Sequence, residues 1–162
     1  MTTYIYPQPE WVDDSVAFYN EEFEKKLASL SGKFAFQINA EPDWGIEGDL
    51  FISMALEAGK LQEFKHCSKD YAFDTADFVL SATPPAWKRI LTNKDKFVGA
   101  FMGGRVKLEK GDTVGALALG PHANTLVDVL TQVDLTFPDD LSPEDLEAFK
   151  TEFIQKRSDR GI

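Results

Sequence analysis

The chain has very little cysteine or histidine with which to do chemistry. Cys67 is the single cysteine among 162 residues, so no disulfide can form within the chain. This usage is typical of a reducing compartment, and we expect a cytoplasmic protein. Residues 1–11 lack a basic stretch followed by an apolar run, so no signal peptide is expected. No apolar run approaches the roughly 20 residues that span a bilayer.

Positive charge is also in short supply. The chain has 17 basic and 27 acidic residues, for a net charge of −10. That charge repels nucleic-acid phosphates and argues against electrostatic docking on anionic membranes. We therefore expect no nucleic-acid partner and no stable membrane insertion. The length and a hydrophobic content of 43% fit one globular domain.

No group of residues forms a catalytic pattern. His66 and His122, the only histidines, belong to different predicted elements. His66 and Cys67 are neighbours on a predicted strand, so they point to opposite faces and cannot act as a nucleophile–base pair. We interpret this segment as a half-exposed strand and expect no catalytic residue and no cofactor.

Three acids, Asp70, Asp74 and Asp77, are spaced by four and three residues. The glycine and the carboxylate spacing of a calcium loop are missing, so no metal site is expected. We interpret the three acids as part of a solvated loop before a strand.

The order of helices and strands follows from apolar periodicity. Apolar residues recur at helical spacing over residues 12–30, which predicts one amphipathic helix. Alternating patterns predict strands at 33–39, 49–57, 61–68, 76–82 and 105–109. We expect at least the first three strands to form an antiparallel meander, the second of them covered on both faces. Further helices are predicted over 83–91, 96–102, 113–119 and 122–133.

The last part of the chain is predicted as an extension. We divide the chain into a domain at 1–133 and an extension at 134–162, in which residues 134–140 are a linker. A final helix begins at Ser142, its N-cap, with Leu146, Phe149 and Phe153 on its apolar side. This stripe must be buried, either as a lid over a binding site or against a second copy of the protein.

The second half of the chain is rich in large apolar residues, more than one face of a small sheet needs. An internal apolar cavity would use this surplus, because such pockets need apolar lining and few polar groups. Ordinary core packing is the alternative.

The order of these features resembles the sterol carrier protein type 2 family. The matching positions of a first strand motif are Asp77, Val79 and Ser81. The matching positions of a second are Gly104, Val106, Lys107, Leu108, Gly111 and Asp112, with Arg105 in place of the usual lysine. The resemblance covers about residues 23–130. Gly103 and Gly104 would turn the chain from an apolar wall into the fifth strand, and we predict at Gly104 a backbone conformation costly for other residues.

The resemblance implies an α+β fold with a five-stranded, mostly antiparallel sheet and helices on one face, enclosing an apolar tunnel. It implies binding of a fatty acid, a fatty acyl-CoA, a sterol-like molecule or another lipid. The residues we expect near the ligand are Trp87, Phe97, Phe101, Met102, Leu117, Leu126 and Leu130.

Two other interpretations remain open at this stage. The chain could be a dimerisation or assembly module, or could host a substrate tail for a lipid-metabolising enzyme. An enzyme that uses the cavity as its active site has the least support, because no acid–base pair or nucleophile was found.

Overall fold

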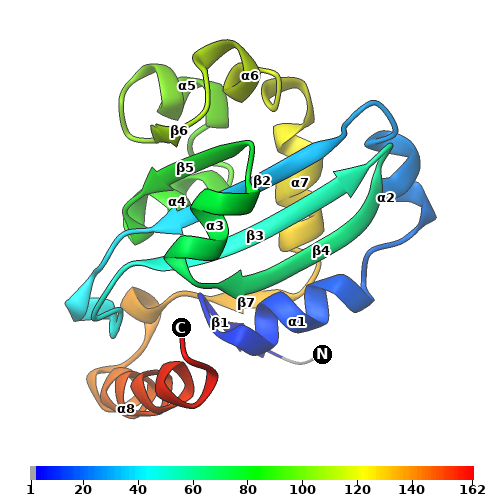
Figure 1. The fold of residues 1–162 in the computed structure, drawn as a ribbon. Coiled ribbons are helices and arrows are strands. Elements are labelled where there is room, and N and C mark those ends of the chain that lie inside the picture. The colour runs from blue at the N-terminus through cyan, green and yellow to red at the C-terminus, as the bar shows by residue number, and fades with distance from the viewer. Residues whose placement is uncertain (1–2) are drawn as a thin grey trace.

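Five strands form the main sheet, in the order β4-β3-β2-β5-β6 (Figure 1). The computed structural model describes residues 3–162. The strands are β2 (Gly32–Ile38), β3 (Leu50–Glu57), β4 (Lys60–Cys67), β5 (Phe78–Ala82) and β6 (Lys107–Lys110). β2, β3 and β4 form the predicted antiparallel meander, whereas β5 pairs with β2 in parallel. The sheet is therefore mixed and mostly antiparallel, as expected.

Eight α-helices and three short 3₁₀ turns occur among residues 3–162. The helices are α1 (Pro9–Ala17), α2 (Glu21–Lys26), α3 (Lys69–Thr75), α4 (Pro84–Leu91), α5 (Phe97–Met102), α6 (Thr113–Leu117), α7 (Ala123–Leu130) and α8 (Pro143–Arg160). The 3₁₀ turns are η1 (Pro42–Trp44), η2 (Gly120–His122) and η3 (Pro138–Asp140). None of these helices is long and apolar enough to cross a membrane.

The single helix predicted over residues 12–30 is wrong, because the chain breaks between α1 and α2. The side chain of Asn20 accepts hydrogen bonds from the backbone N–H groups of Glu22 and Phe23. This cap starts a new helix, so the apolar stripe does not continue on one axis. Val16, which the stripe would bury, is 43% exposed.

The predicted loop around the three acids is also wrong, since Asp70 and Asp74 lie in α3. The Ser68 hydroxyl accepts a hydrogen bond from the backbone N–H of Tyr71 and caps this helix. α3 carries the chain from edge strand β4 across the sheet to β5, which explains why β5 joins β2 in parallel.

Both faces of the sheet are covered, but unequally. α3 packs alone on one face, where a small apolar cluster includes Phe51, Cys67 and Val79. The opposite face carries the main core with α1, α4 and α7 (Figure 1). Residues 50–56 of β3 are all buried, which confirms that this strand is covered on both sides. α3 is therefore an exception to the implied placement of helices on one face.

A second, two-stranded sheet joins the two ends of the chain. β1 (Thr3–Ile5) pairs in parallel with β7 (Asp134–Thr136). The backbone N–H of Tyr6 continues this ladder by donating to Thr136 O at 2.8 Å. The segment predicted as a linker thus holds a strand and the turn η3, and its Phe137 is buried.

The turn at Gly103 and Gly104 follows the prediction. Gly104 has a φ of +80°, a left-handed conformation that is costly for residues with a Cβ atom. The chain leaves α5 here and reaches β6 within a few residues. The double glycine therefore does connect an apolar helix to the fifth strand.

Candidate binding cavity

A cavity of about 80 Å³ lies between the main sheet and the helices that cover it. Its sheet side is formed by Phe36, Ile38, Ile52 and Phe64. Its helical side is formed by Trp87, Ile90, Leu91, Phe97, Leu119, Ala123, Leu126, Val127 and Leu130. Tyr6 and Trp11 complete the lining. None of these side chains carries a charge, so the cavity favours an apolar guest.

The two cavity indoles have their N–H groups satisfied outside the cavity. Trp11 Nε1 donates to Leu130 O at 2.9 Å, and Trp87 Nε1 donates to Gln37 O at 3.1 Å. These bonds fix the orientation of both rings and leave their carbon atoms free to face the cavity. The cavity therefore has aromatic walls without unpaired indole donors.

Tyr6 brings a hydroxyl group to this apolar lining. Its ring packs against Trp11 and Phe137, each at a centroid distance of 5.3 Å. Burial raises the pKa of the Tyr6 phenol well above its usual value. The phenol therefore stays protonated and neutral, and adds no charge to the cavity.

The structure brings four of the seven predicted ligand residues together. Trp87, Phe97, Leu126 and Leu130 line the cavity. The other predicted residues, Phe101, Met102 and Leu117, lie outside its lining. Phe101 and Leu117 are half-buried, and Met102 is 70% exposed. Whether any of the seven touches a ligand stays a prediction.

Sequence reasoning missed most of the sheet side of the cavity. The alternating patterns predict the strands that contain Phe36, Ile38 and Ile52, but none of these residues was assigned to a site. The signal was available, because inward residues of neighbouring strands must face the same helical layer. Tyr6, by contrast, follows β1, whose partner is more than 120 positions away, and no local pattern indicates that pairing.

His66 and Cys67 point to opposite faces of the sheet, as predicted. Cys67 packs in the small cluster under α3, and burial raises the pKa of its thiol. His66 lies on the face that α1 covers, with its Nε2 3.0 Å from Pro7 O. A carbonyl only accepts, so Nε2 carries the proton and donates. Nδ1 is buried without a partner among residues 3–162.

Burial also lowers the pKa of His66 to about 4, although the Pro7 carbonyl acts in the opposite direction. His66 is therefore neutral at physiological pH. A neutral, enclosed imidazole and an undissociated thiol on the opposite face have the properties of structural residues.

The third acid of the predicted loop has a structural role. Asp77 Oδ2 accepts a hydrogen bond from the backbone N–H of Lys33 at 3.1 Å and so joins β2 to the start of β5. Within residues 3–162, no three His, Cys, Asp or Glu side chains are grouped as a metal site requires.

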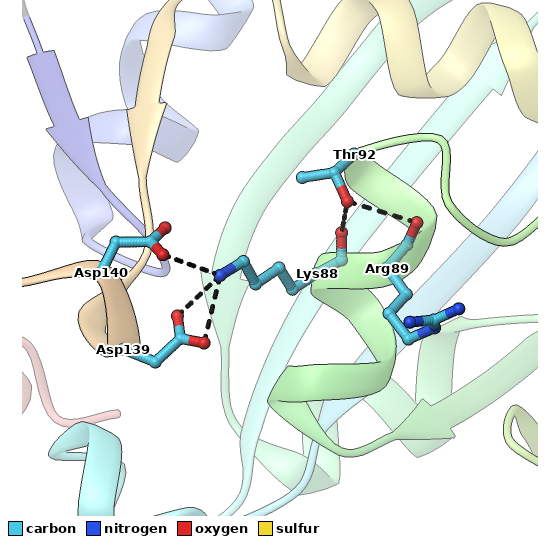
Figure 2. Close-up of polar contacts among 5 residues, drawn as sticks. All are labelled: Lys88, Arg89, Thr92, Asp139 and Asp140. Atoms are coloured by element: carbon cyan, nitrogen blue, oxygen red, sulfur yellow. Dashed lines mark hydrogen bonds and ion pairs between the residues drawn. The ribbon is translucent and has the colours of Figure 1, made fainter.

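One wall of the cavity is tied to the end of the chain. Lys88 lies beside Trp87 on α4, and its Nζ contacts the carboxylates of Asp139 and Asp140 on η3 at 2.9 and 3.1 Å (Figure 2). The same ammonium lies 5.2 Å from the centre of the Phe137 ring. α4 thus lines the cavity with one face and holds η3 with the other.

α8 lies away from the cavity and contributes no lining residue. Its Arg157 donates to Gly48 O at 2.8 Å and to Asp49 O at 3.1 Å, and its Lys156 pairs with Glu10 on α1 at 2.9 Å. Phe149 and Phe153 are buried in the core of the same chain. This geometry argues against both the lid and the dimer contact through this stripe.

Comparisons with known proteins agree with this architecture. The model of the "SCP-2 sterol transfer family" matches residues 16–123. A crystal structure of sterol carrier protein 2 is 24% identical with a TM-score of 0.64, and the alignment covers 78% of this chain and 97% of that one. A solution structure of a conserved hypothetical protein from Thermus thermophilus, possibly a sterol carrier protein, is 25% identical with a TM-score of 0.65, and the alignment covers 80% of this chain and 90% of that one. No curated protein sequence matches the chain.

Proposed function

The chain belongs to the SCP-2 sterol transfer family, and from this we propose that it binds an apolar molecule between its sheet and helices and carries it through water. The ligand class is a fatty acid, a fatty acyl-CoA or another lipid. The single observation that carries the proposal is the uncharged, apolar lining of the cavity. Binding there needs no reactive group, because burial of each CH₂ group contributes about 0.8 kcal/mol.

The size of the cavity sets a condition on this function. At about 80 Å³ it is smaller than the roughly 300–1,000 Å³ of typical ligand pockets. A lipid must therefore enlarge it on entry. An unfilled cavity of this size costs about 2 kcal/mol of stability, which a bound chain recovers.

We infer that the wall from α5 to η2 moves outward when a ligand enters. α5 has six residues, α6 five and η2 three, so this side is built from short helical pieces. The opposite wall is the hydrogen-bonded sheet, which cannot widen without breaking its ladder. Phe101 and Leu117, half-buried in the moving part, would then reach the ligand as predicted.

Native mass spectrometry of the purified protein tests the proposal, followed by denaturing extraction and identification of any released molecule. We expect a one-to-one complex with an extractable lipid, or saturable uptake of a fluorescent fatty acid by protein that was purified empty. Protein that is empty and takes up neither a fluorescent fatty acid nor a fluorescent acyl-CoA would contradict the proposal.

A further inference from the structure

The positive charge of the chain is concentrated in one segment. Residues 84–110 contain seven of the 17 basic residues and two acidic ones, whereas the rest of the chain has ten basic and 25 acidic residues. This segment forms α4, α5 and β6. The net charge of −10, from which we expected no electrostatic docking on anionic membranes, is therefore an average over a basic segment and an acidic remainder.

The same region exposes large apolar side chains. Met102 is 70% exposed and Val98 41%, and they lie one turn apart on α5. Val114, at the start of α6, is 81% exposed. α5 and α6 occupy the end of the molecule opposite α8 (Figure 1). We call the region of Val98, Met102, Val114, Lys94 and Lys96 the α5–α6 face.

The lysines of the α5–α6 face are available for an external partner. Lys94 and Lys96 are exposed, and within residues 3–162 neither of them forms an ion pair. Lys96 has only the neutral amide oxygen of Asn124 at 3.4 Å. Arg105, by comparison, is already paired with Asp95 at 3.4 Å.

We propose that the α5–α6 face docks this protein on a membrane surface that contains anionic lipids. Exposed apolar side chains on a short helix enter the headgroup region, and the lysines beside them contact negatively charged headgroups. Each lysine near such a surface strengthens binding about fivefold. Acidic residues elsewhere on the chain are repelled by the anionic headgroups, so the molecule approaches the membrane with this face toward it.

Docking through this face would place the wall of the cavity next to the lipid. Phe97 on α5 lines the cavity and stacks on half-buried Phe101 at a centroid distance of 6.0 Å. Met102 follows directly and is exposed on the outside. The short helix α5 therefore has one residue in the cavity lining and another on the exposed surface. The docking itself does not depend on the proposed carrier function, since empty protein should dock as well.

Flotation with two kinds of vesicle tests the proposal: phosphatidylcholine alone, and phosphatidylcholine mixed with phosphatidylserine. We expect binding to the mixed vesicles that weakens as salt is added. Met102→Asp combined with Val114→Asp should reduce it about tenfold or more. The matched control, Val16→Asp with Ile154→Asp, changes residues that are 43% and 45% exposed elsewhere and should keep binding.

The test of charge uses Lys94→Glu together with Lys96→Glu, against Lys25→Glu together with Lys60→Glu. Both double variants change the net charge equally, but only the first should lose binding. None of these lysines lines the cavity, so uptake of a fluorescent fatty acid in the absence of vesicles should be retained by both.

Three results would overturn the proposal. The first is a wild-type protein that floats with neither vesicle. The second is an equal loss of vesicle binding in a variant and its control. Binding would then depend on the total charge or the total exposed apolar surface of the protein, not on this face. The third is a wild-type dimer in light scattering that becomes a monomer in the α5–α6 variants. This result would show that the face binds a second copy of the protein instead of a membrane. If the aspartate variant does not fold by circular dichroism, the comparison of the two lysine variants decides alone.

Discussion

Lys88 and Asp139 meet across 51 positions of sequence, with Lys88 Nζ 2.9 Å from Asp139 Oδ1 (Figure 2). Burial alone would lower the pKa of Lys88, but the hydrogen bonds to Asp139 and Asp140 outweigh it, and the pKa is raised. The ammonium is thus held in its charged form between a cavity helix and the segment that leads to α8.

The first prediction concerns this contact. Lys88→Met should lower the free energy of unfolding by about 1 kcal/mol, because both aspartates are partly exposed and the ion pairs are screened. A double-mutant cycle with Asp139→Asn and Asp140→Asn, measured by urea unfolding, gives the coupling. Full additivity of the variants would show that the contact contributes nothing.

Filling the cavity should block binding without harming the fold. Ala123→Leu adds three carbon atoms beside a space of about 80 Å³, so we expect stability to stay equal or rise by about 1 kcal/mol. Uptake of a fluorescent fatty acid should fall about tenfold or more. Ala148→Leu on the exposed side of α8 is the control and should leave uptake unchanged. Normal uptake by Ala123→Leu would place the ligand elsewhere.

The role of α8 is predicted to be structural. Phe153 is fully buried, so Phe153→Ala should cost roughly 3–5 kcal/mol in chemical unfolding. Ile154→Ala on the same helix changes a residue that is 45% exposed and should cost well under half of that. Stopped-flow release of a fatty acid should be alike in both variants wherever they are folded. Faster release in Phe153→Ala alone would restore the lid interpretation.

His66 should make stability depend on pH. Its pKa is about 4 in the folded protein and about 6.5 in the unfolded chain, so the unfolded chain binds more protons between these values. Stability must therefore fall as pH drops through this window, by up to about 3 kcal/mol in total. His66→Gln keeps an N–H donor for Pro7 O but does not titrate. Urea unfolding of both proteins across the window should show the extra loss only with His66, and parallel curves would refute it.

Two glycines with similar backbone angles should respond differently to alanine. Gly59 has a φ of +81°, and a Cβ there would lie 2.3 Å from Glu24 O on α2. Gly104 has a φ of +80° with no atom within 4 Å of that position. Gly104→Ala should cost about 1 kcal/mol from the backbone alone, and Gly59→Ala about 3 kcal/mol or more. Equal losses in thermal unfolding would show that the contact at Gly59 relaxes freely.

Local signals in the sequence were sufficient for most elements. Thr83, Asp112 and Ser142 lie at or directly before the starts of predicted helices, and each accepts a backbone hydrogen bond there. These motifs depend on residues within one turn, so they can be recognised without tertiary information. The same logic, applied to Ser68, would have found α3. The acids that follow it were instead interpreted as loop residues.

Features that depend on distant contacts could not be predicted in this way. β1 and β7 have three residues each and are strands only because they pair with one another. The cavity is a volume left over by packing, so its lining depends on how closely each pair of layers fits. Apolar periodicity predicts the strands that contain Phe36 and Ile52, but it cannot show that space remains beside these side chains.

The pairing of β1 with β7 has a consequence for synthesis of the protein on the ribosome. Tyr6 lines the cavity, and its backbone N–H donates to Thr136 O. This part of the lining therefore cannot be in place before residue 136 has left the ribosomal exit tunnel. The strands of the main sheet and α4 to α7 emerge earlier, with one side of their apolar surface still open to water. A chaperone that recognises exposed aromatic surface would therefore find a binding surface on this chain until residue 136 has emerged.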